Sequence, residues 1–288
     1  MVCYFLCLHP AVVLLAVAGF GRCCKGLLRV RGSAPAFVFF NILFVWGVYI
    51  AVIRKVISPL MDIAFHVELV VLVIGLHSIL SSNPGFVSSG SSCLDKLVNS
   101  PVSDVEAHPE ELEPSTCGTR CEFLAEGISA SIQRVRHCRH CKAYVKGFDH
   151  HCPAFGNCIG QENHVLFIFL LVGFIISEAS YVACSSQFAS KSHILDGTRL
   201  ETSLSGNLAI STMLFSLLQV LWQGVFLIWH IYCICFNIRT DEWINWKRYP
   251  ELQQLVQPQP GETITEMRFI NPYDKGVLRN VKEFLKLH

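Results

Sequence analysis

The sequence predicts an all-α polytopic membrane protein with about four transmembrane helices and a cytosolic, zinc-binding Cys/His-rich domain between the second and the third. Of the 288 residues, 52% are apolar and only 16% are charged, and the mean hydropathy is +0.43. A soluble domain carries about 25% charged residues, so this chain has too few to cover a water-facing exterior. A net charge of +1 also argues against nucleic acid as a partner.

The four spans are almost uninterrupted apolar runs, and a helix of about 20 such residues crosses the hydrocarbon core. We expect them near residues 36–53, 61–80, 165–184 and 208–236. The second and fourth runs also contain polar side chains, which are Asp62, His66, Glu68, His77, Gln219, Gln223 and His230. Such groups usually face the interior of the bundle, either to hydrogen-bond a neighbouring helix or to line a ligand cavity.

Residues 1–20 form a further apolar region with three alternative roles. His9-Pro10 interrupts it, and the remaining run of residues 11–20 is short for a span. Ala16-Val17-Ala18 resembles a signal-peptidase site, but no Lys or Arg precedes the apolar run. The region is therefore an interfacial segment, an additional span or a signal peptide, and the first of these fits its composition best.

The distribution of Lys and Arg predicts the orientation in the membrane. These residues gather before the first span, in the central loop and after the fourth span, whereas the two other loops carry only two each. Loops rich in Lys and Arg stay in the cytosol, so we place the central loop and the C-terminal tail there. In that reducing compartment, a cysteine cluster favours metal binding or catalysis over disulfides.

These features divide the chain into six segments. An apolar and basic N-terminal segment (1–35) precedes the first two spans (36–80). A linker rich in Ser, Gly and acidic residues is typical of a disordered connection. We expect this linker at residues 81–133. It leads to the Cys/His-rich domain (134–164), the last two spans (165–236) and the tail (237–288).

The Cys/His-rich domain has the spacing of a structural zinc site. Cys138 and Cys141 are separated by two residues, which places two thiolates on one tight turn. A closed zinc site takes four protein ligands, and His151 and Cys158 can supply the other two. This ligand set leaves Cys152 without a metal.

Cys152 is the candidate nucleophile. In an extended segment, neighbouring side chains point to opposite faces, so His151 can face the zinc while His150 and Cys152 face away from it. A histidine can take the proton of a thiol, and Asp149 can orient the imidazole of His150. The alternative is that all these residues bind metal and that none of them reacts.

These residues resemble the signature of the DHHC-type protein S-acyltransferases, also called palmitoyltransferases. The main similarity is Asp149-His150-His151-Cys152-Pro153, preceded by His137-Cys138-x2-Cys141 and followed by Asn157-Cys158-x-Gly160-x2-Asn163. Weaker motifs occur in the order that the family has, and they are Asn83-Pro84-Gly85, Arg239-Thr240-Asp241-Glu242 and Asn271-Pro272-Tyr273-Asp274-x-Gly276 with Asn280 beyond. The resemblance extends from the first span to about Leu285.

The resemblance implies transfer of a long-chain acyl group, palmitate, from acyl-CoA to protein cysteines through a thioester on Cys152. It also implies four helices around an acyl-chain cavity, structural zinc, acyl-CoA as co-substrate, contact with membrane lipid and protein substrates with juxtamembrane cysteines. It assigns catalysis to Cys152, His150 and Asp149. Thr240, which would hydrogen-bond the Asp149 carboxylate, has a supporting role, as have Glu242 and Asn280. The expected location is an endomembrane, Golgi or ER.

The chain departs from the family pattern at a second zinc site. His137 is in place, but Tyr144 stands where the family has a thiolate. The nearest upstream pair, Cys117 and Cys121, is more widely spaced and lies too far away. A phenol is a poor structural ligand for zinc, so we expect about one zinc per chain.

Several other residues leave two interpretations open. Ala154 stands where the family usually has Trp, which could change the contact with the acyl chain. Five basic side chains could hold the phosphates of coenzyme A or attract anionic lipid, and they are Arg134, Arg136, Arg139, Lys142 and Lys146. Four cysteines near the spans could be acylated or simply pack, and they are Cys23, Cys24, Cys233 and Cys235. His164 adjoins the third span, and we expect an interfacial residue there rather than a metal ligand.

Two alternative functions remain. A catalytically weak, membrane-anchored zinc-binding adaptor would use the four metal ligands but has no need of an unligated Cys152. A thioesterase or another cysteine hydrolase would use the same Cys–His pair on a soluble substrate. A membrane-embedded cavity suits a lipid chain better, because exposing it to water costs about 0.8 kcal/mol per CH₂.

Overall fold

The computed structural model describes residues 33–87, 134–191, 204–256 and 266–286. The apolar segment 1–20 lies outside the described residues, and so do Cys23, Cys24, Cys117, Cys121 and most of the expected linker. The four expected spans, the Cys/His-rich domain and most of the tail lie within them.

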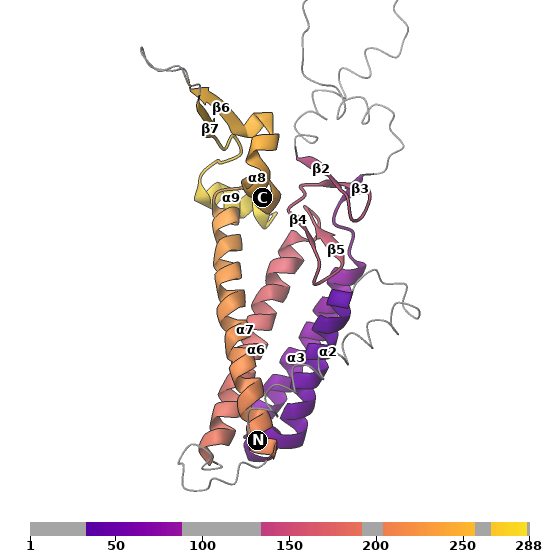
Figure 1. Cartoon of the computed structure of the whole chain (residues 1–288), viewed down its shortest axis with the longest axis vertical. Coiled ribbons are helices and arrows are strands. Elements are labelled where there is room, and N and C mark those ends of the chain that lie inside the picture. Colours follow the sequence, from indigo (N-terminus) through magenta and orange to yellow (C-terminus); the bar gives the residue numbers. More distant parts are fainter. Residues whose placement is uncertain (1–32, 88–133, 192–203, 257–265, 287–288) are drawn as a thin grey trace, which may run out of the picture.

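Four long helices form the apolar part of the molecule. They are α2 (Ser33–Val48), extended by the π-helical turn η1 (Tyr49–Ile53) and the 3-10 turn η2 (Arg54–Val56), then α3 (Pro59–Ser81), α6 (His164–Lys191) and α7 (Leu204–Cys235). Each is long and apolar enough to cross a membrane, which confirms the four predicted spans. In Figure 1 the helices run alongside one another, and α6 packs against both α3 and α7.

The helices are apolar around their whole circumference. In α3, Phe65, Leu69 and Leu72 are buried against the other helices, whereas Val67 and Val70 are more than half exposed. A helix that is hydrophobic all round belongs inside a large core or in a bilayer. The exposed apolar side of α3 is therefore the side that faces lipid.

A polar turn joins the first two spans. The Ser58 side chain accepts a hydrogen bond from an N–H of the first turn of α3, and Pro59 occupies the first helical position, where no N–H is needed. Asp62 then binds back to the first span, since it accepts a hydrogen bond from the Tyr49 hydroxyl at 3.0 Å and forms an ion pair with Arg54 at 3.0 Å. Asp62 thus serves contact between helices, one of the two roles expected for polar residues in the spans.

Hydroxyl groups bridge the helices deeper in the bundle. The Ser180 hydroxyl of α6 donates to Glu68 Oε1 of α3 at 3.0 Å. The hydroxyls of Tyr181 in α6 and Thr212 in α7 lie 2.6 Å apart. Glu68 therefore also has the helix-bridging role, whereas His230 belongs to the site described below.

Short strands occur in the Cys/His-rich domain and the tail, and the all-α prediction did not include them. Strands β1 (Phe86–Val87), β3 (Ala143–Lys146) and β2 (Val135–Cys138) form an antiparallel sheet in that order. The other strands form two hairpins, β4 (His150–Cys152) with β5 (Asn157–Ile159) and β6 (Gln253–Val256) with β7 (Glu266–Phe269). The mostly helical fold is confirmed. The strands were not predicted because segments of two to four residues are too short to give a periodic signal.

Two asparagine side chains tie the Cys/His-rich domain to the end of α3. Asn157 Nδ2 donates to the carbonyl oxygens of Ile79 and Ser82 at 3.0 and 2.9 Å. Asn163 Nδ2 donates to the Ser82 hydroxyl at 2.9 Å. The last carbonyl groups of a helix have no partner within it, so these contacts complete α3 and fix the position of the domain at once.

The segment Asn83-Pro84-Gly85 leads from α3 into β1. Asn83 Oδ1 accepts hydrogen bonds from the N–H groups of Gly85 and Phe86 at 2.9 and 2.8 Å, which stabilises the turn. Gly160 lies directly against it. A Cβ atom at Gly160 would be 2.4 Å from the Pro84 carbonyl oxygen and 2.6 Å from a side chain of β3.

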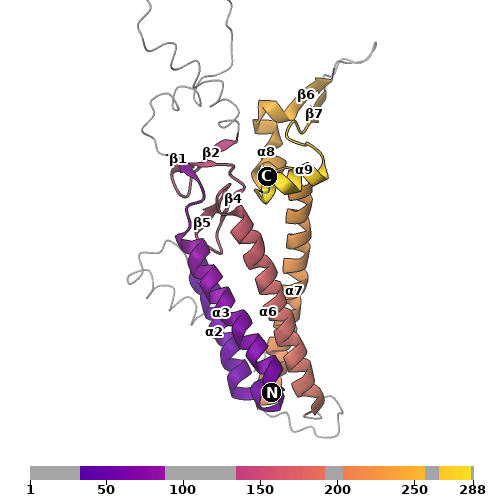
Figure 2. The same ribbon diagram turned by 180° about the vertical axis from the view of Figure 1, so that it is seen from behind.

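The C-terminal tail lies at the end of α7 (Figure 2). Its helical segments are α8 (Thr240–Asn245), the 3-10 turns η4 (Trp246–Arg248) and η5 (Pro250–Leu252), and α9 (Val277–Phe284). Asn280 of α9 is buried. Its Nδ2 donates to the Cys235 carbonyl oxygen at 2.8 Å and to Asp274 Oδ1 at 2.7 Å. Asn280 therefore joins α9 to the end of α7.

The close approach at Gly160 gives a test of how the domain is held on the bundle. We expect Gly160→Ala to lower the stability by about 1–3 kcal/mol, because rigid backbone must move to admit the methyl group. The measurement is the thermal unfolding midpoint of the protein in detergent.

The matched control is Gly224→Ala in α7, where an added Cβ meets nothing within 4 Å. That variant should keep or raise the midpoint, since Ala is the better helix former. Equal midpoints for the two variants would contradict the packing described here.

Candidate functional site

Four potential zinc ligands come together at one end of the Cys/His-rich domain. The β4–β5 pairing sets His151 directly opposite Cys158, and the turn between β2 and β3 contributes Cys138 and Cys141. His151 Nδ1 lies 3.8, 3.5 and 3.7 Å from the Sγ atoms of Cys138, Cys141 and Cys158. The Sγ atoms of Cys141 and Cys158 are 3.3 Å apart. The ligand set chosen from the spacing is therefore one cluster in space.

The cluster fits zinc by geometry and by charge. Bonds of about 2.3 Å to sulfur and about 2.0–2.1 Å to nitrogen in a tetrahedron place sulfur and nitrogen about 3.6 Å apart and two sulfurs about 3.8 Å apart. The three distances from His151 match the first value, and the distance between Cys141 and Cys158 is shorter than the second. Burial raises the pKa of Cys141, and burial together with the neighbouring thiols raises the pKa of Cys158. Raised pKa values disfavour the thiolate forms of these cysteines. A divalent cation offsets this, because it stabilises the thiolates that ligate it. The His140 ring stacks on the His151 ring, with centroids 4.7 Å apart, and holds it in place.

The opposite face of β4 holds the catalytic candidates. Side chains two residues apart in a strand share a face, so His150 and Cys152 point away from the metal ligands. His150 Nδ1 lies 2.7 Å from Asp149 Oδ2, which leaves Nε2 for the Cys152 side chain. Cys152 is buried, and it belongs to the same apolar cluster as Phe155 and Phe167.

Asp149 and His150 are an electrostatically coupled pair. Burial lowers the pKa of His150, but the hydrogen bond to Asp149 and the interaction with Cys152 outweigh it and raise this pKa to about 9. Burial also opposes the ionisation of Asp149, yet the hydrogen bond from His150 and the charges of His150 and Arg239 hold its pKa below the usual range. His150 is thus a stronger base than a free imidazole, and Asp149 keeps its charge.

Thr240 contacts Asp149, as the resemblance implied, but through its main chain. The Thr240 N–H donates to Asp149 Oδ1 at 3.0 Å. Its Oγ1 is buried and has no hydrogen-bond partner among the described residues. The fully buried Asp149 carboxylate therefore has both oxygens occupied, one by this N–H and one by His150.

Glu242, the other supporting residue expected in this motif, holds the start of the tail. It forms an ion pair with Arg134 at 2.8 Å, and its Oε2 accepts a hydrogen bond from the Arg239 N–H at 2.9 Å. The Arg134 guanidinium also lies 3.7 Å from the ring centroid of Tyr273. Glu242 thus links the Cys/His-rich domain to the tail.

Two buried histidines belong to the site although sequence reasoning did not place them there. His164 is the first residue of α6, but its side chain does not face solvent or lipid, because it is 2% exposed and its Nδ1 lies 2.5 Å from Arg239 Nη1. His230 of α7 is fully buried, with its ring centroid 5.8 Å from that of His150. The signal available in the sequence was a histidine in each of two apolar runs, which is too weak to place either one.

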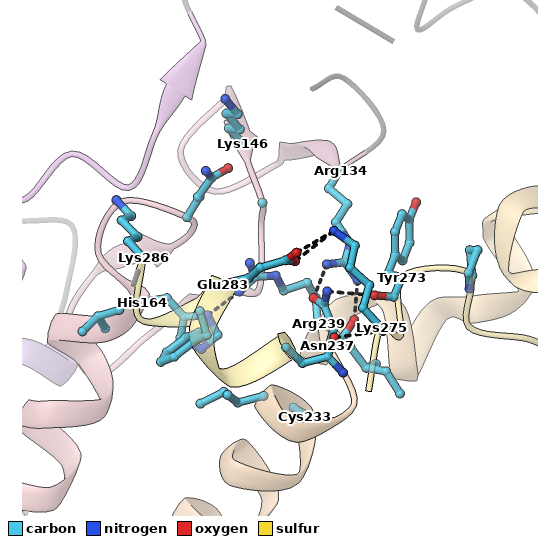
Figure 3. Close-up of a pocket in the computed structure, with 18 residues that line it drawn as sticks. Arg134, Lys146, His164, Cys233, Asn237, Arg239, Tyr273, Lys275, Glu283 and Lys286 are labelled. Carbon is cyan, nitrogen blue, oxygen red and sulfur yellow. Dashed lines mark hydrogen bonds and ion pairs between the residues drawn. The ribbon is translucent and has the colours of Figure 1, made fainter. Parts of the chain in front are cut away.

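A basic cavity of about 660 Å³ opens next to this cluster, between the Cys/His-rich domain and the tail (Figure 3). His164 lines its wall, and the buried Cys233 also lines it, which fits the packing role for that cysteine. Of the five basic residues proposed to bind phosphate or lipid, only Arg134 and Lys146 line the cavity. The other cationic side chains around it are Arg239, Lys275 and Lys286.

The comparisons with known proteins agree with the residues of the site. Residues 128–247 match the family model of the DHHC palmitoyltransferases. The palmitoyltransferase AKR1 of Mortierella alpina is 29% identical over 206 residues, which are 67% of this chain and 35% of that protein. The palmitoyltransferase ZDHHC17 of Mus musculus is 28% identical over 163 residues, 53% of this chain and 24% of that protein.

A plant protein matches a similar share of the chain. The probable protein S-acyltransferase 6 of Arabidopsis thaliana is 26% identical over 200 residues, which are 69% of this chain and 42% of that protein. The chain thus matches between about a quarter and two fifths of the length of these three relatives.

The metal centre predicts about one zinc per chain. His137 and Tyr144 face each other across β2 and β3 with ring centroids 5.0 Å apart, so they form an aromatic pair. Within the described part of the chain, His137 belongs to no group of three possible metal ligands. Elemental analysis of the purified protein measures the count. A value near two that falls to one in a Cys117→Ser/Cys121→Ser variant would contradict this prediction.

The two neighbouring histidines of β4 provide a matched control for the same measurement. His151→Ala should lose the zinc and destabilise the domain, because ligation and folding are coupled. His150→Ala should keep the zinc. Loss of zinc from the His150 variant would reverse the two assignments.

Proposed function

We propose that the chain is a protein S-acyltransferase that moves a long-chain acyl group, palmitate, from acyl-CoA to protein cysteines, on the premise that residues 128–247 match the family model of the DHHC palmitoyltransferases. The observation that supports this most is Cys152, a buried thiol with no place in the metal cluster, beside the Asp149–His150 pair. A metal site alone would need neither a buried carboxylate nor a base with a raised pKa. The adaptor alternative therefore leaves the most constrained residues of the site unexplained.

In the first step Cys152 becomes acylated. His150 Nε2 takes the proton of the Cys152 thiol, and Asp149 stabilises the resulting imidazolium through Nδ1. The thiolate attacks the carbonyl carbon of the acyl-CoA thioester and forms a new C–S bond. The bond to the coenzyme A sulfur breaks, and the proton on His150 passes to the leaving thiolate.

In the second step the acyl group leaves the enzyme. His150 takes the proton of a substrate cysteine, whose thiolate attacks the thioester on Cys152. Cys152 leaves as a thiolate and recovers the proton from His150, so no net charge or electron is transferred. Zinc at the Cys138 cluster would fix the β4–β5 hairpin and the turn beside it without touching the reacting atoms.

The apolar surroundings of Cys152 suit a lipid chain. Phe155 and Phe167 pack with Cys152 in a cluster that continues among the helices, and Ala154 packs against it. An acyl chain that enters the bundle from Cys152 avoids a cost in water of about 0.8 kcal/mol per CH₂. A substrate cysteine near a membrane can reach Cys152, because β4 lies where α3 ends and α6 begins (Figure 1).

The basic cavity is the site we propose for the phosphates of coenzyme A. Lys146 comes from β3, and Lys275 and Lys286 come from the tail (Figure 3), so the cationic groups surround the cavity from two sides. Lys275 and Lys286 are held by ion pairs with Glu283 at 2.7 Å and Glu162 at 2.9 Å. The cavity shares His164 with the catalytic cluster, so a headgroup there would place its thioester towards Cys152.

We also propose that the Cys/His-rich domain and the tail lie in the cytosol of a Golgi or ER membrane. Acyl-CoA is a cytosolic thioester, and the basic residues gather on the side of these segments. Loops with such a bias stay on the cytosolic side during insertion. The basic surface also suits anionic lipid headgroups.

Cys152→Ser should abolish the acyl label that the purified protein acquires from a clickable palmitoyl-CoA, because a serine hydroxyl is a far weaker nucleophile than a thiolate. The label on the unchanged protein should be released by hydroxylamine, as a thioester is. Zinc content should be the same in both.

The control is Cys184→Ser, which changes a buried cysteine of α6 that is no part of the site. It should label like the unchanged protein. Equal labelling of the Cys152 and Cys184 variants would refute the acyl-enzyme.

Lys146→Gln should raise the KM for palmitoyl-CoA about tenfold with little change in kcat, since a hydrogen bond to a charged group contributes about 1.5 kcal/mol. Initial rates over a range of palmitoyl-CoA concentrations give both constants. The control is Lys282→Gln, the same change in charge on an exposed residue of α9 that does not line the cavity. An equal rise in KM for the two variants would show that overall charge, not the cavity, attracts the substrate.

A further inference from the structure

His230 is a polar side chain without a partner in the most buried part of the site. It lies in α7, its side chain is fully buried, and within the described ranges neither of its ring nitrogens has a hydrogen-bond partner. Polar groups inside a membrane span are costly and mark functional sites. A neutral imidazole always carries one N–H, so His230 holds a hydrogen-bond donor ready inside the protein.

The surroundings of His230 direct it to the reaction centre. Its ring packs edge-on against Phe226, with centroids 4.5 Å apart, and against Phe167 at 5.0 Å. Phe167 in turn contacts the His150 ring at 5.4 Å and belongs to the apolar cluster of Cys152. His230 therefore shares a wall with the nucleophile and its base and does not face lipid.

The gap between His230 and the Asp149–His150 pair is wide enough for one intervening atom. The potential ligand atoms of Asp149, His150 and His230 all lie within 4.8 Å of one another, yet no direct hydrogen bond joins His230 to the other two. Two hydrogen bonds of about 2.8 Å can meet at a single oxygen across such a gap. The geometry therefore fits one oxygen atom placed beside His150.

The charge balance shows what kind of oxygen fits. Arg239 can only donate, so its contact with His164 Nδ1 makes that nitrogen an acceptor and puts the proton on Nε2 (Figure 3). His164 Nε2 is likewise buried without a partner among the described residues. Each oxygen of Asp149 already accepts one hydrogen bond, from His150 and from the Thr240 N–H. His164 and His230 thus hold N–H groups with no partner among the described residues, and such donors suit an oxygen of developing negative charge.

We propose that His230 donates a hydrogen bond to the carbonyl oxygen of the acyl thioester and stabilises its negative charge when Cys152 attacks. The inference rests on the proposed function. As the new C–S bond forms, the electron pair of the C=O bond moves to this oxygen. It returns when the bond to the coenzyme A sulfur breaks and His150 gives that sulfur its proton. A positioned donor of this kind contributes about 10²–10³-fold to kcat.

A divalent cation is the other ligand that Asp149, His150 and His230 could take. It would have to compete with the hydrogen bonds that the Asp149 oxygens make with His150 and the Thr240 N–H, and with the zinc cluster. An acceptor oxygen competes with neither, so the observations favour it. The zinc count of a His230 variant decides between the two.

The test compares two reactions of the same thiol. Acylation by palmitoyl-CoA forms an oxyanion, whereas alkylation by iodoacetamide displaces iodide and forms none. We expect His230→Phe, which keeps an aromatic ring between Phe167 and Phe226, to lower kcat for acylation by about 10²–10³-fold. The rate of Cys152 alkylation, followed by peptide mass spectrometry, should stay within about twofold, and the KM should change little.

Two further variants control for packing. His230→Gln keeps a donor and should retain more activity than His230→Phe, although it fits the aromatic wall less well. His77→Phe makes the same substitution on an exposed histidine of α3 and should leave both rates unchanged. Together they separate the loss of a donor from the insertion of a phenyl ring into a span.

The outcomes that overturn the proposal are distinct. Acylation of His230→Phe at the rate of the unchanged protein would show that no donor was lost. Equal losses in acylation and alkylation would assign His230 to positioning His150 instead, and loss of a metal ion would assign it to a cation. Failure of the proposed function looks different, because the unchanged protein and Cys152→Ser would then label alike.

Discussion

The site depends on the alternation of side chains along β4. His150, His151 and Cys152 follow one another in an extended strand, so the middle residue points to one face and its neighbours point to the other. The pairing with β5 fixes which face is which, because it sets His151 opposite Cys158. A shift of one residue would turn Cys152 towards the metal cluster and remove the nucleophile. The four potential metal ligands therefore define the register that the proposed reaction needs.

The β4–β5 hairpin must also be fixed in position at the ends of the helices. Asn157 and Asn163 bind the end of α3 from one side, and the Thr240 N–H binds Asp149 from the tail. Arg134 and Glu242 then join the domain to α8 of the tail. Because each of these contacts uses a helix end or a strand edge, the site sits where helices α3, α6 and α7 meet the short strands. This position puts Cys152 in the apolar cluster of the bundle, and the basic cavity lies next to the site, with His164 in its wall.

The sequence alone predicted what depends on local pattern. The four spans followed from apolar runs, and the ligands Cys138, Cys141, His151 and Cys158 followed from spacing and the strand alternation. The pattern could not show that Thr240 binds Asp149 through its main chain, because the donor depends on how the chain enters α8. Arg134 and Arg136 were proposed for phosphate or lipid, but they form ion pairs with Glu242 and Glu251, more than 100 residues away in the chain. The short strands also went unpredicted, since pairings of two to four residues leave no periodic signal.

His164 and His230 also could not be placed in the site from the sequence. Each is a single histidine in or beside an apolar run. Its role depends on contacts with residues far away in the chain, such as the contact of His164 with Arg239. Only the assembled structure shows that both face Asp149 and His150. The site thus combines a motif readable in the sequence with a buried polar lining that depends on how α6 and α7 pack.

The most direct test of the division between metal face and reactive face is the zinc coordination measured by X-ray absorption before and after acylation of Cys152. We expect three sulfur ligands at about 2.3 Å and one nitrogen at about 2.0–2.1 Å in both states, because the acylated sulfur of Cys152 is not a ligand. Loss of a sulfur ligand on acylation would place Cys152 in the metal site and contradict the account.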